Sequence, residues 1–499
     1  MYDVVIVGSG LGGLVCGSIL SKEGYKVCIV EQHYQIGGCL QTFKREGCVF
    51  DTGMHYVGSF DKGQLLNQLF TYFNIADKLK VKQLDQNAFD IISIHGEEYP
   101  LAQGHDNFIE QLKPFFPTEE KALIKYVDKL KEIRTILYDF INPNDHVLTS
   151  VMPDLKYYDI NALGYISSLT SNTRLQNVLS GLNSLYSGHP DKSPLYVHAV
   201  INNSLIEGAW RFVDGGDQIG FLLASEIEKH GGSIIKKCKV EQFLTNKAGD
   251  TIVGLKTSIG ESFPAKYYIS DINPTSTINM IDTPVIRKGY RLRLNSMELT
   301  VSVFSLYIVL KENTFPYMNH NYYHNNPDDV WGMRYYSKIK WPGGYMLYTP
   351  ATSKSDVYAD SVIVMTYMFY EELKKWENTS VGNRGDDYKS FMDEKAELLI
   401  AEITKRFPAL KNAIKSYYTS SPLTYRDYTG TINGSIYGIL KDYQHPLNTI
   451  ISQRTRLSNL LFTGQNLNLH GVLGVTMTAL QTCGHFLGLN YLFNKVNNG

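Results

Sequence analysis

Asp3-Val4-Val5-Ile6-Val7-Gly8-Ser9-Gly10-Leu11-Gly12-Gly13-Leu14 is the stretch that decides the fold. A short apolar run closed at once by glycines predicts a strand buried on both faces, followed by a tight turn and a helix. We expect Gly8 to permit the turn, Gly10 to let the backbone approach a pyrophosphate, and Gly13 to let the helix pack on the strand. With Gly12, these residues form a predicted dinucleotide-binding loop.

A second strand and an acidic residue complete this pattern. Residues 26–30 form the next apolar run, and Glu31 follows at its carboxyl end. A carboxylate in that place accepts hydrogen bonds from both hydroxyls of an adenosine ribose and repels a 2′-phosphate. The nucleotide is therefore predicted to be FAD or NAD rather than NADP.

A glycine pair separates these two cofactors. Gly37 and Gly38 lie a few residues beyond Glu31. An NAD site does not use such a pair, whereas a flavoprotein chain that passes beside the pyrophosphate and under the isoalloxazine ring does. The predicted cofactor is therefore FAD.

The segment from Gly37 to Gly58 resembles a known family. It contains Phe50-Asp51-Thr52-Gly53-Met54-His55-Tyr56-Val57-Gly58. Read with the opening glycine loop, it is similar to the FAD-dependent family of phytoene desaturases, carotene isomerases and all-trans-retinol 13,14-reductases, and most similar to the retinol saturase branch. Many flavin amine oxidases carry an arginine after the glycine pair, where this chain has Cys39, and that difference argues against an amine oxidase.

The resemblance implies an α/β protein of two parts. The first is a glutathione-reductase-like, FAD-binding Rossmann domain built from residues 1–75, 196–284 and 431–499. The second is an inserted α+β substrate domain, with a mixed sheet and a helical cap, built from residues 76–195 and 285–430. Within it, eight aromatic side chains would suit a hydrophobic tunnel, although core packing accounts for at least half of them: Tyr322, Tyr323, Trp331, Tyr335, Tyr336, Trp341, Tyr345 and Tyr348.

The resemblance also implies further cofactor-binding residues. A strand near Val240 gives its backbone to the adenine in such proteins. Gly464 ends a late apolar strand, and Gly474 and Val475 lie in the last predicted helix. The amino terminus of that helix would stabilise the negative charge that collects on the flavin during reduction.

Composition and charge exclude several classes of function. The 499-residue chain has a formal net charge of −1, so no basic signature indicates nucleic acid. Its six cysteines form no C-x-x-C pair and no zinc pattern, which favours a reducing, cytoplasmic setting and predicts no metal site. No apolar run approaches the length of a membrane span, while peripheral membrane contact stays open. The sequence predicts no oligomeric state.

Saturation of an alkene needs a proton donor beside the flavin. His55 and Tyr56 are the predicted catalytic residues because the motif places them near the ring. His470, Tyr425 and Tyr437 are second choices.

Three functions follow from these features. The first is a redox enzyme that saturates or desaturates a carbon–carbon bond of a hydrophobic polyene or isoprenoid lipid by hydride transfer at flavin N5. The second is a polyene cis-trans isomerase that uses reduced FAD without net electron transfer. The third is a flavin-bearing lipid carrier without catalysis. The resemblance favours the first.

Overall fold

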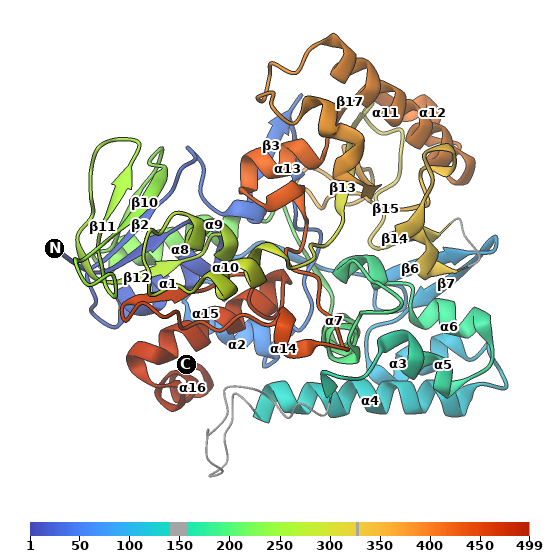
Figure 1. Cartoon of the computed structure of the whole chain (residues 1–499). Helices are drawn as coiled ribbons and strands as arrows, with labels where there is room; N and C mark the ends of the chain where they lie inside the picture. Colours follow the sequence, from blue (N-terminus) through green and yellow to red (C-terminus); the bar gives the residue numbers. More distant parts are fainter. Residues whose placement is uncertain (140–156, 326–328, 499) are drawn as a thin grey trace.

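The computed structural model describes residues 1–139, 157–325 and 329–498 (Figure 1). Its first sheet is parallel and has five strands in the order β18-β12-β1-β2-β9. These strands are β1 (Tyr2–Val7), β2 (Val27–Val30), β9 (Ser233–Ile235), β12 (Ala265–Ser270) and β18 (Leu460–Phe462). The register pairs Val5 with Cys28 on one side and with Tyr268 on the other.

The side chains of β1 alternate between two hydrophobic cores, as its apolar sequence predicts. Val4 and Ile6 pack in a core with α1 (Leu11–Lys22), α8 (Asp217–Lys229) and α15 (Gly471–Leu487). Val5 and Val7 pack on the other face with the hairpin of β10 (Val240–Thr245) and β11 (Ile252–Thr257). The predicted strand, turn and helix are therefore present, and β1 is buried from both sides.

One predicted strand is wrong. From the sequence alone we predict one strand from Ser233 to Phe243, but the chain leaves the parallel sheet after Ile235 and starts β10 at Val240. Lys237 has a φ of 56°, a left-handed conformation that no strand contains. The Cys238 amide then donates to the Glu31 carbonyl at 2.8 Å, which turns the chain across the end of β2.

The second sheet is mixed and has seven strands in the order β17-β13-β16-β15-β14-β6-β7. Its strands are β6 (Asp90–Ile94), β7 (Glu97–Leu101), β13 (Ser302–Leu310), β14 (Asn321–Asn325), β15 (Gly344–Tyr348), β16 (Ser361–Met368) and β17 (Ile414–Ser420). Only β6 and β14 pair in parallel. The helices α11 (Asp386–Arg406) and α12 (Leu410–Ala413) share a core with one face of this sheet.

A group of helices packs against the other face of the second sheet, at the lower right of Figure 1. They are α3 (His105–Leu112), α4 (Glu120–Asp139), α5 (Ala162–Leu169), α6 (Thr173–Leu179) and α7 (Leu195–Glu207). They account for the predicted helical cap. The expected α/β class, with a Rossmann-like parallel sheet beside a mixed sheet and helices, is confirmed.

Shorter elements connect these layers. They are β3 (Thr42–Arg45), β4 (Cys48–Asp51), α2 (Leu65–Tyr72), β5 (Val81–Gln83), β8 (Trp210–Phe212), α9 (Pro274–Asn279), α10 (Lys288–Asn295), α13 (Pro422–Thr429), α14 (Pro446–Thr449) and α16 (Leu489–Asn498). Short 3-10 helices lie at Gly38–Leu40, Ala76–Lys78, Asn183–Tyr186, Val330–Tyr335, Lys338–Lys340, Tyr370–Trp376 and Ile432–Gly434.

The two sheets take their strands from different parts of the chain. Strands of the parallel sheet lie within residues 1–75, 196–284 and 431–499, and strands of the mixed sheet lie within 76–195 and 285–430. The assignment of these two sets to a cofactor domain and a substrate domain stays a prediction. Among the described residues, no helix is long and apolar enough to cross a membrane.

Candidate functional site

One cavity of about 530 Å³ runs from the glycine loop after β1 to the helices beside the mixed sheet. Of the predicted cofactor-binding residues, ten line it: Gly8, Gly10, Gly12, Glu31, Gly37, Gly38, Val240, Gly464, Gly474 and Val475. Both predicted catalytic residues, His55 and Tyr56, line it as well, as do the second choices Tyr425, Tyr437 and His470. The structure thus brings together in one space residues that lie far apart in the sequence.

Gly13 is the one predicted residue outside the cavity lining. A Cβ atom at this position would lie 2.2 Å from the carbonyl oxygen of Gly8. Such a contact is impossible, so glycine is what lets α1 begin this close to the end of β1. This is the packing that the sequence predicts for Gly13.

Glu31 is held ready at the end of β2. Its Oε2 accepts hydrogen bonds from the amide and the hydroxyl of Ser9, at 2.9 and 2.6 Å, and its Oε1 accepts from the His33 amide at 2.8 Å. The side chain is 9% exposed. Each carboxylate oxygen has further acceptor capacity for a ribose hydroxyl.

Asp271 is a residue of this site that sequence reasoning missed. It follows β12 and lines the cavity, and Cβ atoms at Gly10, Gly12 and Gly464 would lie 2.5, 2.4 and 2.6 Å from its carboxyl oxygens. Gly10 therefore makes room for Asp271, a reason for this glycine that its sequence context does not reveal. Burial raises the pKa of Asp271 to about 7, although hydrogen bonds from the backbone of Gly13 and Gly10 oppose that shift.

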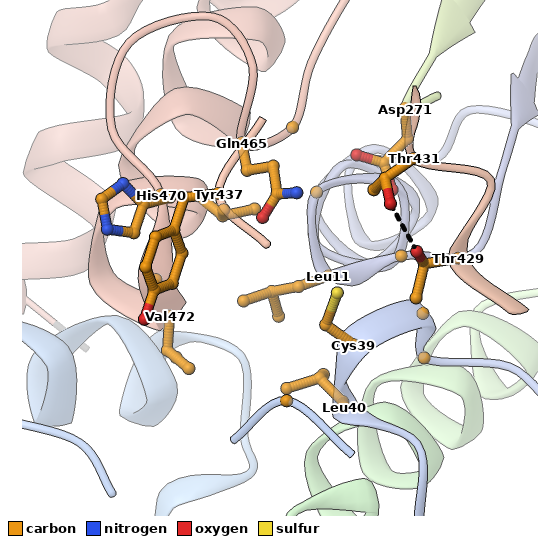
Figure 2. A pocket seen from close by; sticks show the side chains of 18 of the residues that line it. Leu11, Cys39, Leu40, Asp271, Thr429, Thr431, Tyr437, Gln465, His470 and Val472 are labelled. Atoms are coloured by element: carbon orange, nitrogen blue, oxygen red, sulfur yellow. Dashed lines mark hydrogen bonds between the residues drawn. The ribbon is translucent and has the colours of Figure 1, made fainter. Parts of the chain in front are cut away.

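Figure 2 shows part of this pocket from close by. Asp271, Thr429 and Thr431 lie on one side, with a 3.1 Å hydrogen bond between the two threonine hydroxyls. Tyr437 and His470 lie on the other side as a stacked pair whose ring centroids are 4.2 Å apart. Leu11 and Cys39 lie between them.

The amino terminus of α15 closes the cavity near His470. His470 is the residue before the helix, its ring Nε2 lies 2.8 Å from the Leu185 carbonyl oxygen, and Gly471 to Val475 line the pocket. The first amides of this 17-residue helix have no partner within the helix. They offer donors and the positive end of a dipole to an anionic group.

His55 carries a neutral imidazole ring at the wall of the cavity. Burial lowers its pKa to about 4, with a contribution from the nearby Arg211 cation. Its Nδ1 is buried and has no hydrogen-bond partner among the described residues. A neutral imidazole is a weak acid, so His55 suits hydrogen bonding to a bound molecule better than proton donation.

Tyr56 belongs to a polar cluster. Its hydroxyl donates to Asp90 Oδ2 at 2.7 Å and lies 2.9 Å from the hydroxyl of Tyr323. Asp90 is fully buried, and burial raises its pKa to about 8. Asp90, like Asp271, could not be predicted as a site residue from the sequence, because no local motif marks it.

The part of the cavity beyond His55 and Tyr56 is mostly apolar. It is lined by Leu66, Leu185, Val200, Ile201, Leu205, Met365 and Ile436. Among the described lining residues, formal charges occur only at Glu31, Lys239 and Asp271, all near the glycine loop. The cavity therefore has a polar end and an apolar end.

The expected aromatic tunnel is not part of this cavity. None of the eight aromatic residues between 322 and 348 lines it among the described residues. Most are buried in the cores of the mixed sheet, whereas Tyr335 is 57% exposed. The apolar end is built instead by α7 and the segments packed against it.

The residues present fit FAD. The glycine loop has no room for side chains, Glu31 is oriented for a ribose, and a helix begins at the far side of the same cavity. The unpartnered Nδ1 of buried His55 provides one further polar atom to a bound group.

Comparisons with known proteins agree with this geometry. Residues 6–73 match the NAD(P)-binding Rossmann-like domain. The structure of putrescine oxidase bound to putrescine is similar at a TM-score of 0.64, covering 97% of this chain and 98% of its own, with 14% identity. At that identity the similarity shows the fold alone.

Two named relatives extend over nearly the whole chain. The all-trans-retinol 13,14-reductase of Danio rerio is 29% identical, over 97% of this chain and 85% of its own. Prolycopene isomerase 2 of an Oncidium hybrid cultivar is 23% identical, over 99% of this chain and 85% of its own. The predicted resemblance is confirmed: over nearly its whole length the chain is similar to an all-trans-retinol 13,14-reductase and to a prolycopene isomerase, and its first residues match a Rossmann-like domain.

Proposed function

We propose that this protein is an FAD-dependent oxidoreductase that saturates or desaturates a carbon–carbon double bond of a polyene or isoprenoid lipid. One observation carries the proposal: a single cavity joins a dinucleotide-binding loop to an apolar chamber whose described lining has no formal charge. A hydrophobic substrate gains free energy by entering such a chamber, and its double bond reaches the cofactor there. The relatedness to an all-trans-retinol 13,14-reductase supports a polyene substrate.

The chain's own residues would divide the work of holding the cofactor. Glu31 would accept the adenosine ribose hydroxyls, Gly8 to Gly12 would surround the pyrophosphate, and the Val240 backbone would contact the adenine. The amino terminus of α15 would face the flavin. When bound, FAD supplies the hydride chemistry, which none of the twenty side chains can provide.

The protein would orient the substrate and exclude water. The side chains of Val200, Ile201 and Leu205 on α7 form one wall of the apolar chamber. Holding the double bond in one place removes the entropy cost of meeting the cofactor, and a dry chamber protects the reaction from solvent. Tyr56 is our first choice for the proton donor, because its hydroxyl is hydrogen-bonded to the buried Asp90 carboxyl, whereas the buried Nδ1 of His55 has no hydrogen-bond partner among the described residues.

A second candidate function is cis-trans isomerisation of a polyene with reduced FAD. The relatedness to a prolycopene isomerase favours it. The same cavity would serve this reaction, but the double bonds would remain.

Anaerobic mixing separates these functions. Reduced holoprotein is mixed with all-trans-retinol and, separately, with prolycopene, and the absorbance of the flavin and of the polyene is followed. A saturase reoxidises the flavin and bleaches the polyene chromophore. An isomerase changes the polyene isomer while the flavin stays reduced. Tight polyene binding without either change indicates the carrier.

Val200→Trp tests whether the apolar chamber binds the substrate. The indole would fill space next to α7, so we expect at least tenfold weaker polyene binding with the FAD content unchanged. Val253→Trp is the matched control, because Val253 is 49% exposed on β11, away from the cavity. Equal polyene binding by the wild type and Val200→Trp would contradict the assignment of the chamber.

A further inference from the structure

Tyr56 is connected to a buried carboxyl group that the cavity does not reach. Asp90 is 0% exposed and absent from the cavity lining, and its Oδ2 accepts the Tyr56 hydroxyl at 2.7 Å. The Tyr323 hydroxyl lies 2.9 Å from that of Tyr56, and either oxygen can be the donor. The parallel pairing of β6 with β14 sets Asp90 opposite Asn321 and fixes this arrangement.

The other carboxyl oxygen of Asp90, Oδ1, is linked through Asn321 to the positive charge of Arg211. The Asn321 amide donates to Asp90 Oδ1 at 2.7 Å, and Arg211 donates to Asn321 Oδ1 at 2.6 Å. Arg211 also donates to the carbonyl oxygens of Thr349 and Met318, at 2.6 and 3.2 Å. The buried Arg211 guanidinium is therefore fixed in place with Asn321 between it and Asp90, and it is not paired with Asp90 directly.

A carboxyl group held in this way can store a proton. Burial favours the neutral acid, and it raises the pKa of Asp90 to about 8. The groups facing it that titrate or carry charge are Tyr56, Tyr323 and Arg211. The cation behind Asn321 would stabilise the carboxylate once the proton has left.

We propose that Asp90 is the proton store for Tyr56, a positioning residue that acts only through this tyrosine; the inference rests on the proposed function. Saturation of a double bond adds a hydride, supplied by the reduced cofactor, and one proton. The Tyr56 O–H bond breaks as a C–H bond forms on the substrate carbon. The O–H bond on Asp90 Oδ2 then breaks, and its proton crosses the 2.7 Å contact to the Tyr56 oxygen, with donor and acceptor exchanged, which restores the Tyr56 hydroxyl. Asp90 becomes a carboxylate, and before the next turnover it regains a proton through the Tyr56 hydroxyl, the member of this cluster that lines the cavity.

The test compares four variants of the reduced holoprotein in single turnovers with all-trans-retinol, over a range of pH that spans about 8. Tyr56→Phe should slow bleaching of the polyene roughly a hundredfold or more, since it removes the general acid. We expect the wild-type rate to fall as pH rises through about 8, and Asp90→Asn should slow bleaching about tenfold and abolish this fall. Asp90→Glu should restore most of the rate and a fall with pH.

Asp51→Asn is the matched control. Burial raises the pKa of Asp51 to about 7, and its Oδ1 accepts the Gly216 amide at 2.8 Å, but it has no hydrogen bond to Tyr56 among the described contacts. We expect this variant to keep the rate and pH profile of the wild type. A wild-type profile in Asp90→Asn, or the same loss in Asp51→Asn, would overturn the proposal.

Infrared difference spectroscopy provides a readout that needs no substrate. The spectrum of the wild type minus that of Asp90→Asn, at neutral pH, should show the C=O band of a protonated carboxylic acid, and Tyr56→Phe should shift that band. Absence of the band or of the shift would overturn the proton store. If the wild type leaves all-trans-retinol unchanged, the proposed function fails, whereas this spectrum still decides whether Asp90 holds a proton beside Tyr56.

Discussion

Glu31 is the residue that we expect to hold the ribose of the cofactor. It is oriented by the amides of Ser9 and His33 before any nucleotide arrives. Glu31→Ala removes both ribose contacts, which should weaken FAD binding by about 2 kcal/mol, the usual size for hydrogen bonds to a charged group. This corresponds to roughly thirtyfold in the dissociation constant.

The measurement is titration of the apoprotein with FAD, followed by flavin fluorescence. Glu228→Ala is the control, since Glu228 is an exposed residue of α8 away from the cavity. An unchanged dissociation constant for Glu31→Ala would refute the role of Glu31.

We expect Asp271 to make cofactor binding depend on pH. Its pKa is raised to about 7, so the carboxyl is neutral below that pH and becomes an anion above it. An anion next to the glycine loop repels the pyrophosphate. We therefore expect FAD to bind several-fold more weakly above pH 7 than below it, and Asp271→Asn to remove this dependence.

The apoprotein can be titrated with FAD on either side of this pKa to measure the effect. Glu228→Ala should keep the wild-type dependence. The interpretation is wrong if FAD binding to Asp271→Asn weakens with rising pH as much as FAD binding to the wild type does.

At the scale of elements, the contact between β1 and α1 depends on a missing side chain. A Cβ at Gly13 would lie 2.2 Å from the Gly8 carbonyl oxygen, which is backbone and cannot move aside. Gly13→Ala should therefore lower the free energy of unfolding by about 2 kcal/mol, as overpacking does. Thermal unfolding of the holoprotein measures it.

Gly289→Ala is the control for Gly13→Ala, and here we expect the same change from glycine to alanine to stabilise the protein. Gly289 lies in α10, its φ is not left-handed, and no atom lies within 4 Å of the position that an added methyl group would take. Alanine should stabilise this helix by about 0.5–1 kcal/mol. A stable Gly13→Ala variant would show that α1 can shift away from β1.

A helix, strand or loop could be predicted from the sequence where the residues that define it lie close together in the chain. The glycine loop, Glu31 and α15 are marked by residues close together in the chain, and all of them meet at the cavity. The break at Lys237 was not predictable, because the Glu31 carbonyl that fixes it lies more than two hundred residues earlier. Asp90 and Asp271 were missed for the same reason: their partners are Asn321 and the glycine loop, which only the folded chain brings near.

At the scale of the whole molecule, the buried proton of Asp90 should make the free energy of unfolding depend on pH. The pKa of Asp90 is raised from 3.8 to about 8, so the folded state binds a proton that the unfolded state releases between these values. The stabilisation from this proton is complete below the lower value and is lost as pH rises through about 8. Other groups also titrate in this range, so the comparison has to be made between variants.

The expected result is a difference in unfolding free energy between wild type and Asp90→Asn that decreases steadily as pH rises from about 4 to about 8. Urea unfolding at several pH values measures it. A difference that does not change with pH would show that Asp90 is already ionised in the folded protein.

The cavity is lined by residues that run from Val7 to Val475. On the ribosome, β1 and its glycine loop emerge long before α15, which supplies another wall of the cavity. The yellow cofactor therefore cannot be fully enclosed until α15 has been made. Cells short of riboflavin should then accumulate full-length chains that are nearly folded but have no flavin bound.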